Sequence, residues 1–163
     1  IRTGKISTDT AEFAAAEKEV KDRLESLVSN KGIHSVDYYH KKLGNIMWEK
    51  CGMSRNEQGL KEAIAEIAEL RDDFWKNVSV PGGAYELNQQ LEKAGRVADF
   101  LELGELFAKD ALDRNESCGG HFREESAEVG GPQDGEALRD DDNYAYVSAW
   151  EYKGKPSDAV LHK

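Results

Sequence analysis

Three side chains of nucleophilic or metal-binding type, Ser117, Cys118 and His121, stand close together in the sequence. The two-residue gap between Cys118 and His121 suits zinc, but a structural zinc site needs four ligands and the sequence has no second Cys/His pair. A catalytic serine or cysteine needs a base poised beside it, and nothing in the spacing fixes these residues as a dyad. We therefore expect neither a metal site nor a nucleophile here.

Two other patterns point to chemistry only weakly. Asp37 and His40 are three residues apart on a predicted helix, but a di-iron bundle needs such a pair twice, with two further glutamates facing inward. The second pair is missing, so a solvated helix face is the better interpretation. The glycine-rich residues 130–135 follow no predicted strand and open no helix, and no phosphate-binding fingerprint occurs elsewhere.

The remaining signal is a dense polar cluster over residues 114–125, where the longest predicted helix ends. It contains two arginines, a histidine and several acids, which could form a hydrogen-bonded corner through charge-assisted pairs. The alternative is an ordinary helix C-terminus, where basic residues interact favourably with the helix dipole. The sequence leaves both interpretations open.

Four helices are predicted by apolar residues that recur every three to four positions. Ser7 or Thr8 is expected to cap the first, and Ser35 and Asn56 the second and third, because their side-chain oxygens accept a free backbone N–H. Gly32 and the run 81–83 supply stops. The expected ranges are about 9–30, 36–52, 57–78 and 84–115.

Each helix has a single apolar face, so none is stable alone in water and the faces must bury one another. Short connections favour antiparallel neighbours. Residues 1–116 therefore predict an antiparallel bundle of three to four helices in a mainly α fold. We expect the leucine, phenylalanine and methionine residues of these faces to be core.

Residues 117–163 have a different character. Residues 117–143 are rich in glycine and acid and predict a long irregular loop. Residues 144–152 are aromatic and β-branched and predict a strand, with a turn at 153–156 and a return strand at 159–161. We expect this small C-terminal β-hairpin to pack on the bundle, giving one domain overall, with surface left for a neighbour because an isolated hairpin is marginally stable.

Composition narrows the possible partners. The 163 residues carry a formal net charge of −10, which disfavours binding to nucleic acid and to anionic membranes. No apolar run approaches the roughly 18 residues of a membrane span. Two cysteines indicate a reducing compartment rather than a disulfide scaffold. The polar start, with no apolar stretch behind it, predicts no signal peptide. Because the first residue is Ile1 and not Met, we expect a piece of a longer protein.

The polar cluster also carries a resemblance to a known family. Residues 114–123 read Arg-Asn-Glu-Ser-Cys-Gly-Gly-His-Phe-Arg and resemble a segment of the flavoprotein subunit of succinate dehydrogenase and fumarate reductase. That family typically shows R-x-E-S-R-G-x-H-x-R-x-D after a long helix, then an acidic loop and an aromatic hairpin, in the order found here. Two positions depart from the pattern: Cys118 replaces the usual arginine and Glu125 the usual aspartate.

The resemblance implies that this chain is the C-terminal helical domain of such a subunit. The full-length subunit would use FAD to interconvert succinate and fumarate and exchange electrons with an iron–sulfur subunit. It would be cytoplasmic and peripheral to the inner membrane through other subunits. This domain would bind no FAD, hold no catalytic, cofactor-binding or metal residues, and contact the flavin-binding domain and the iron–sulfur subunit. A structural or interface motif is then expected at Arg114, Glu116, Ser117, His121 and Arg123.

Two alternatives stay open. The chain could be a freestanding acidic helical module that recruits a basic partner. It could also be the same domain of a related flavoprotein, such as L-aspartate oxidase or adenylylsulfate reductase. The aromatic hairpin ending in Glu151 and Tyr152 favours the dehydrogenase over the oxidase.

Overall fold

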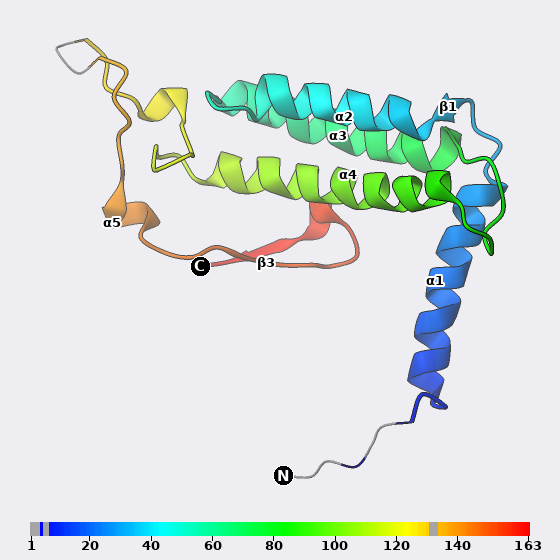
Figure 1. The fold of residues 1–163 in the computed structure, drawn as a ribbon. Helices are drawn as coiled ribbons and strands as arrows, with labels where there is room; N and C mark the ends of the chain where they lie inside the picture. The colour runs from blue at the N-terminus through cyan, green and yellow to red at the C-terminus, as the bar shows by residue number, and fades with distance from the viewer. Residues whose placement is uncertain (1–3, 5–6, 131–133) are drawn as a thin grey trace.

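The computed structural model of the chain describes residue 4, residues 7–130 and residues 134–163. It is mainly helical with two small two-stranded sheets (Figure 1). Gly131 and Pro132 of the predicted loop lie outside the described residues. The elements are α1 Ala11–Ser29, β1 His34–Ser35, α2 Val36–Lys50, α3 Glu57–Asn77, β2 Val78–Ser79, α4 Gln89–Asp113, η1 Glu124–Ser126, α5 Asp141–Tyr144, β3 Ala149–Glu151, η2 Pro156–Asp158 and β4 Val160–His162.

Side-chain caps set the starts of α2 and α3, as predicted. Ser35 Oγ accepts a hydrogen bond from the Tyr38 N–H at 3.3 Å, and Asn56 Oδ1 accepts one from the Gly59 N–H at 2.8 Å. Each oxygen satisfies a backbone donor that the first turn of a helix leaves free.

Two predicted helix starts are wrong. The first helix begins at Ala11 rather than near residue 9, because Ser7 Oγ accepts from the Asp9 N–H at 3.0 Å in a turn before the helix. The fourth begins at Gln89 rather than Ala84. Asn88 caps it and also donates to the carbonyls of Pro81 and Gly83, which holds residues 81–88 in an irregular loop.

The core lies between α2, α3 and α4, with α3 antiparallel to the other two (Figure 1). The parallel pair of β1 and β2 ties the start of α2 to the end of α3, with His34 opposite Val78. Gly104 lets α4 approach α2 closely, since a Cβ there would lie 3.3 Å from Leu43 Cδ1. The buried apolar residues of these helices are Val36, Tyr39, Leu43, Leu60, Ala63, Ile67, Leu70, Phe74, Leu91, Ala94, Val97, Ala98, Leu101, Ala108 and Ala111.

Helix α1 departs from the predicted bundle. It projects away from the other helices, and only its C-terminal end lies against them (Figure 1). Leu27 is buried, but Phe13 is 48% exposed and Val20 57% exposed, so the expectation that its whole apolar face is core is wrong. Within the described residues, the face that these side chains form has nothing packed over it.

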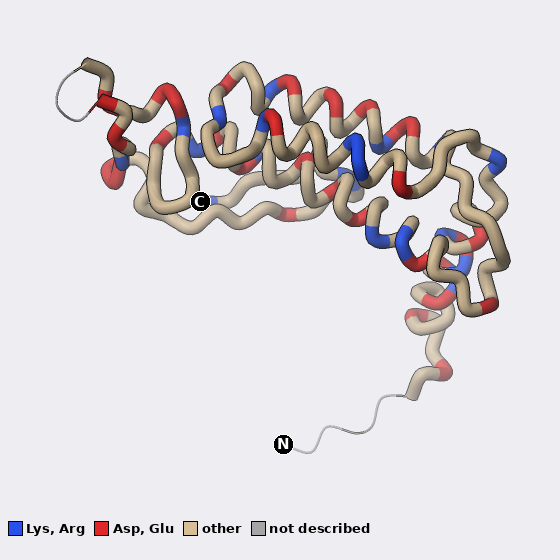
Figure 2. Tube along the Cα trace, turned by 45° about the horizontal axis from the view of Figure 1, so that its top comes forward, with Lys and Arg blue, Asp and Glu red and all other residues tan. Residues whose placement is uncertain are grey.

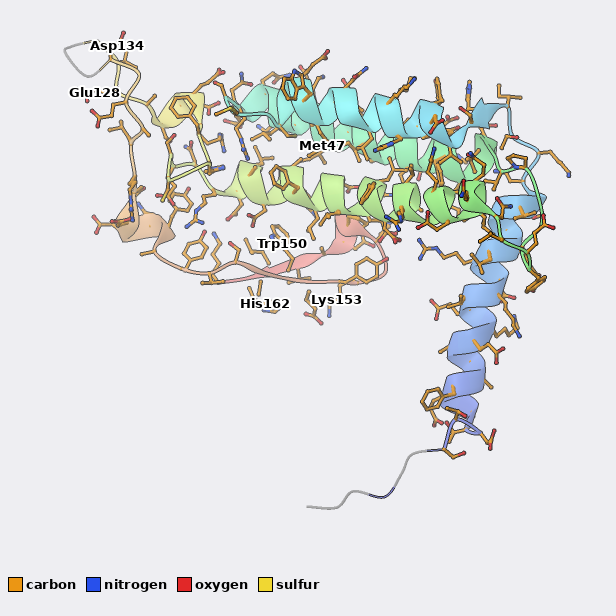
Figure 3. All side chains as sticks on the ribbon, in the orientation of Figure 1. Met47, Glu128, Asp134, Trp150, Lys153 and His162 are labelled. Atoms are coloured by element: carbon orange, nitrogen blue, oxygen red, sulfur yellow. The ribbon has the colours of Figure 1, made fainter. Side chains whose placement is uncertain are left out.

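The C-terminal segment returns along α4. The β3–β4 pair places Trp150 opposite Leu161, and Trp150 points toward α4 while Lys153 and His162 point away from the helices (Figure 3). Trp150 Nε1 donates to Asp110 Oδ1 at 2.8 Å. This confirms the small C-terminal hairpin, but β3 is shorter than residues 144–152, because Asp140 caps the short helix α5 that takes up Tyr144.

Candidate interface corner at the end of α4

Arg123 is the central side chain of the polar cluster. It is 2% exposed, and its Nη1 donates to the carbonyls of Ala111 at 2.9 Å and Leu112 at 3.1 Å. Its Nε donates to Glu125 Oε2 at 3.0 Å. A single guanidinium therefore satisfies carbonyls at the end of α4 that have no partner within the helix. Both interpretations of the cluster hold, since the hydrogen-bonded corner is built on the helix C-terminus.

Ser117 fixes the backbone of Arg123. It is fully buried, and its Oγ accepts from the Arg123 N–H at 2.9 Å and donates to the Arg123 carbonyl at 3.1 Å. In the sequence between Ser117 and Arg123 lies a tight turn. The Cys118 N–H donates to the His121 carbonyl at 2.8 Å, the His121 N–H donates to the Cys118 carbonyl at 3.1 Å, and Gly119 in the turn has a φ of +59°. The two-residue gap that suited zinc is thus a tight turn with a glycine in the left-handed region.

Glu116 and Arg114 join this corner to the following segment. Glu116 is 2% exposed, and its Oε2 accepts from the Asp140 N–H at 2.9 Å. Arg114 Nη2 donates to the Tyr144 carbonyl at 2.6 Å, and its Nε lies 2.9 Å from Glu116 Oε1. Residues more than twenty positions downstream are therefore held at the end of α4 by these two side chains.

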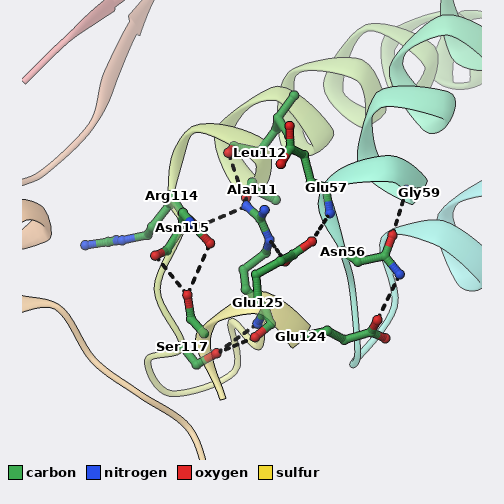
Figure 4. Close-up of polar contacts among 12 residues, drawn as sticks. Asn56, Glu57, Gly59, Ala111, Leu112, Arg114, Asn115, Ser117, Glu124 and Glu125 are labelled. Atoms are coloured by element: carbon green, nitrogen blue, oxygen red, sulfur yellow. Dashed lines mark hydrogen bonds and ion pairs between the residues drawn. The ribbon is translucent and has the colours of Figure 1, made fainter. Parts of the chain in front are cut away.

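Glu124 and Glu125 bring the N-terminal end of α3 to the same place (Figure 4). Glu125 Oε1 accepts from the Glu57 N–H at 2.5 Å, and Glu124 Oε2 accepts from Asn56 Nδ2 at 2.9 Å. A carboxylate at a helix N-terminus is stabilised by the free N–H groups and by the helix dipole. Glu125, where the resembled family has aspartate, reaches this helix start.

His121 lies half-buried beside three arginines. Its Nε2 is 2.7 Å from the Arg114 carbonyl, so this nitrogen carries the proton that the carbonyl accepts. Burial lowers the pKa of His121, the hydrogen bond to the Arg114 carbonyl opposes this by raising it, and the charges of the three arginines lower it further. The neutral imidazole is the favoured form in this corner.

The metal-site candidates have other partners. Asp37 Oδ1 accepts from Lys93 Nζ at 2.9 Å, and His40 is exposed with its ring near that of Phe100. In the part of the chain that the structure describes, no three His, Cys, Asp or Glu side chains converge as metal ligands.

The structure adds one residue that the sequence analysis missed. Arg55 lies between α2 and α3 and is 7% exposed. The backbone N–H of Arg55 donates to the Phe122 carbonyl at 3.3 Å, and the Arg55 carbonyl accepts from the backbone N–H of Glu124 at 3.0 Å. Arg55 belongs to none of the apolar helix faces that the sequence predicts. Its place directly before the cap residue Asn56 is the only feature of the sequence that points to a structural role.

Comparison with known proteins decides the family. The family model described as fumarate reductase flavoprotein C-term matches residues 40–162, which include α3, α4, the corner and the hairpin. The chain belongs to this family. It is 28% identical to the fumarate reductase flavoprotein subunit of Haemophilus influenzae over 138 residues. These residues cover 85% of this chain and 21% of that protein. The Helicobacter pylori protein of the same name is 33% identical over 72% of this chain and 16% of its own length.

Solved structures agree on the fold. A chain of an E. coli quinol fumarate reductase structure matches 98% of this chain and 25% of its own length with a TM-score of 0.79 at 24% identity. The L-aspartate oxidase of Synechocystis is also similar, with 27% identity over 54% of this chain and 18% of its own length. The chain thus spans about a fifth of the length of the flavoprotein relatives it matches.

Proposed function

We propose that this chain is the C-terminal helical domain of the flavoprotein subunit of a succinate dehydrogenase or fumarate reductase. The full-length subunit would interconvert succinate and fumarate through FAD and exchange electrons with an iron–sulfur subunit. The family match over residues 40–162 carries this proposal. The matched proteins named as fumarate reductase flavoprotein subunits supply the reaction class.

Within that subunit, the domain would be structural. The sheets of the described residues are two-stranded with strands of two or three residues, which does not fit the parallel βαβ fold that binds dinucleotides. These residues would therefore take no direct part in flavin chemistry. FAD and the reacting groups would belong to the flavin-binding domain, against which this domain packs. The subunit would be cytoplasmic and peripheral to the inner membrane. Within the described residues, no helix has the length and apolar character of a membrane span.

Arg114, Glu116, Ser117, His121 and Arg123 would hold the segment after α4 in the shape that docks on neighbours. Their hydrogen bonds to the backbone of residues 111–144 support this role. They would not act on substrate. Their effect on the reaction would be indirect, through assembly.

The test uses the full-length flavoprotein subunit reconstituted with its partners. We expect His121→Ala and Arg123→Ala to lower the yield of assembled complex and, in proportion, its succinate oxidation. Arg139→Ala, at an exposed arginine in the same C-terminal segment, is the matched control and should leave both unchanged. Normal assembly and normal succinate oxidation in both corner variants would reject the interface role.

The similarity to L-aspartate oxidase supports a second candidate function, in which the full-length protein oxidises L-aspartate. Turnover assays of the full-length protein with succinate and with L-aspartate separate the two. Turnover of L-aspartate without turnover of succinate would favour the oxidase.

A further inference from the structure

The apolar stripe of α1 is covered at one end only. Phe13, Val20 and Leu27 follow one another at seven-residue intervals, and Ala16 stands between the first two, so all four share one face of the helix. Leu27 is buried in the core, whereas Phe13, Ala16 and Val20 are exposed. These three exposed residues form the bare stripe. The face that is core at the C-terminal end of α1 therefore continues uncovered toward the N-terminal end, as far as the structure describes the chain.

Contacts to other elements hold only the last turns of α1. Arg23 Nη2 donates to Asp99 Oδ1 of α4 at 2.5 Å. Among the described residues, the hydrogen bonds and ion pairs of residues 11–22 stay within α1 or reach only Thr10, just before it. This part of the helix projects from the bundle (Figure 1). A helix of so few residues is marginally stable in water by itself, so a covering surface would stabilise it.

Acidic residues border the bare stripe. Glu12 and Glu19 each directly precede a stripe residue, and neither forms an ion pair within the part of the chain that the structure describes. A surface hollow of about 640 Å³ beside the first stripe residue has Asp9 and Glu17 in its lining. Residues 9–22 together carry five acids and two lysines, a net charge of −3. This charge favours a cover with a basic border and disfavours a second copy of the chain, which would bring the same acids.

The matched family places further polypeptide beside this helix. Its model is described as the C-terminal part of the flavoprotein, and the chain spans about a fifth of the length of its relatives. The match to the E. coli quinol fumarate reductase chain covers 98% of this chain, so α1 belongs to the shared fold. The rest of such a protein precedes the matched part and is joined to α1 at its N-terminal end. A surface tethered so close to the bare stripe is present at a high effective concentration, which favours docking.

We propose that the bare stripe is the docking surface for the polypeptide that precedes this chain in the full-length protein. The docked surface would be apolar at its centre, to cover Phe13 and Val20, with lysine or arginine side chains opposite Glu12 and Glu19. Helix α1 would then be held at both ends, by the bundle through Leu27 and by the preceding part through the bare stripe, which sets the orientation of the two parts. This docking requires the proposed C-terminal position of the chain in a longer subunit, but not the proposed reaction.

Hydrogen–deuterium exchange, measured by mass spectrometry on peptides that cover residues 11–22, tests the docking. The 163-residue chain is compared with the FAD-loaded full-length protein, and α3 serves as an internal reference that is protected in both. We expect exchange in residues 11–22 to be at least about tenfold slower in the full-length protein, because docking suppresses local opening of the helix. Equal rates in the two proteins would overturn the proposal. Slow exchange in the 163-residue chain would also overturn it, whether at high dilution or only at high concentration, where a second copy is the cover.

Succinate turnover by the same full-length preparation separates the docking from the proposed reaction. Slow exchange of residues 11–22 in a protein that does not turn over succinate supports the docking and rejects the reaction. Fast exchange in a protein that turns over succinate rejects the docking alone.

Two adjacent alanines offer a matched pair of variants. Ala16→Lys places a bulky cation in the bare stripe, where an apolar surface with a basic border rejects it, and should speed exchange of residues 11–22 in the full-length protein about fivefold or more. Ala15→Lys makes the same change on another face of α1 and should leave the protection unchanged. In the 163-residue chain the two variants should exchange alike, since both carry the same residues in a helix without a cover. Full protection in the Ala16→Lys full-length protein would contradict the docking.

Discussion

At the scale of the residue, the end of α4 depends on the side chain of Arg123. Its guanidinium donates to the carbonyls of Ala111 and Leu112 inside the protein, where water cannot replace it. Arg123→Met keeps much of the volume but leaves these acceptors and the Glu125 carboxylate without their donor. We expect the free energy of unfolding to fall by roughly 3 kcal/mol.

Urea denaturation followed by circular dichroism measures this loss. The control is Arg139→Met, at an arginine whose side chain is 62% exposed and paired with Asp141. Its change should stay within about 0.5 kcal/mol. Similar stabilities for the Arg123 and Arg139 variants would show that the buried network contributes nothing.

A second prediction at this scale concerns pH. Burial lowers the pKa of His121 in the folded state, while an unfolded histidine titrates near about 6.5. Below that value the unfolded chain binds the proton more readily, so stability is lost as pH falls through about 6.5 toward the folded pKa, by at most about 1.4 kcal/mol per pH unit. The pKa of Glu124 is lowered by hydrogen bonds from Asn56 and Ser54, so its contribution is lost only below the ordinary value of 4.5.

Denaturation between pH 7.5 and about 5.5 therefore isolates the histidine. His121→Gln keeps an N–H donor for the Arg114 carbonyl and should flatten the pH dependence in this window. His40→Gln, at an exposed histidine, should behave like the original protein. An identical pH profile for His121→Gln would contradict the assignment.

At the scale of the element, the junction between α1 and α3 depends on Gly32. Its backbone passes so close to the end of α3 that a Cβ would lie 2.0 Å from the Asn77 carbonyl carbon and 2.6 Å from the Val78 oxygen. Gly32→Ala forces backbone apart, which we expect to cost about 1–3 kcal/mol of unfolding free energy. Denaturant titration of the variant measures it.

Two other glycines serve as matched controls. Gly44 in α2 and Gly95 in α4 have nothing within 4 Å of an added Cβ. Alanine at either position should stabilise the protein by about 0.5–1 kcal/mol. In a helix interior, glycine loses more conformational freedom on folding than alanine does, because the unfolded chain is freer at a glycine. If all three alanine variants gained stability, the close approach at Gly32 would be refuted.

At the scale of the whole molecule, charge is spread over the surface rather than gathered in one field. Basic residues are interspersed among the more numerous acidic ones along the helices, and further acids mark the segment after α4 (Figure 2). This segment is tied to the bundle by the Arg114, Glu116 and Trp150 side chains. Because these contacts join residues 117–163 to α4, we expect both parts to unfold together, as the predicted single domain requires.

Two probes test this cooperativity. In the double variant Trp48→Phe, Trp75→Phe, fluorescence reports Trp150 on the hairpin, while circular dichroism reports mainly the helices. The two urea transitions should share one midpoint. A fluorescence transition at clearly lower urea would mean that the C-terminal segment detaches before the bundle unfolds.

The sequence by itself determined the helices, the caps at Ser35 and Asn56, the hairpin and the position of the polar cluster. These features depend on the periodicity of apolar residues and on hydrogen bonds between residues a few positions apart. Both can be recognised from short stretches of the sequence. The family resemblance was likewise contained in a short run, residues 114–123, and the match over residues 40–162 confirmed it.

Tertiary structure alone decided which surfaces are covered and which distant side chains meet. The apolar face of α1 looks like the others in sequence, yet Phe13 and Val20 stay exposed because burial depends on where neighbouring helices lie. Arg55 gave no periodic signal, but folding brings it to Phe107 and His121, more than fifty positions away. Such contacts depend on how elements pack in space, which spacing along the chain does not encode.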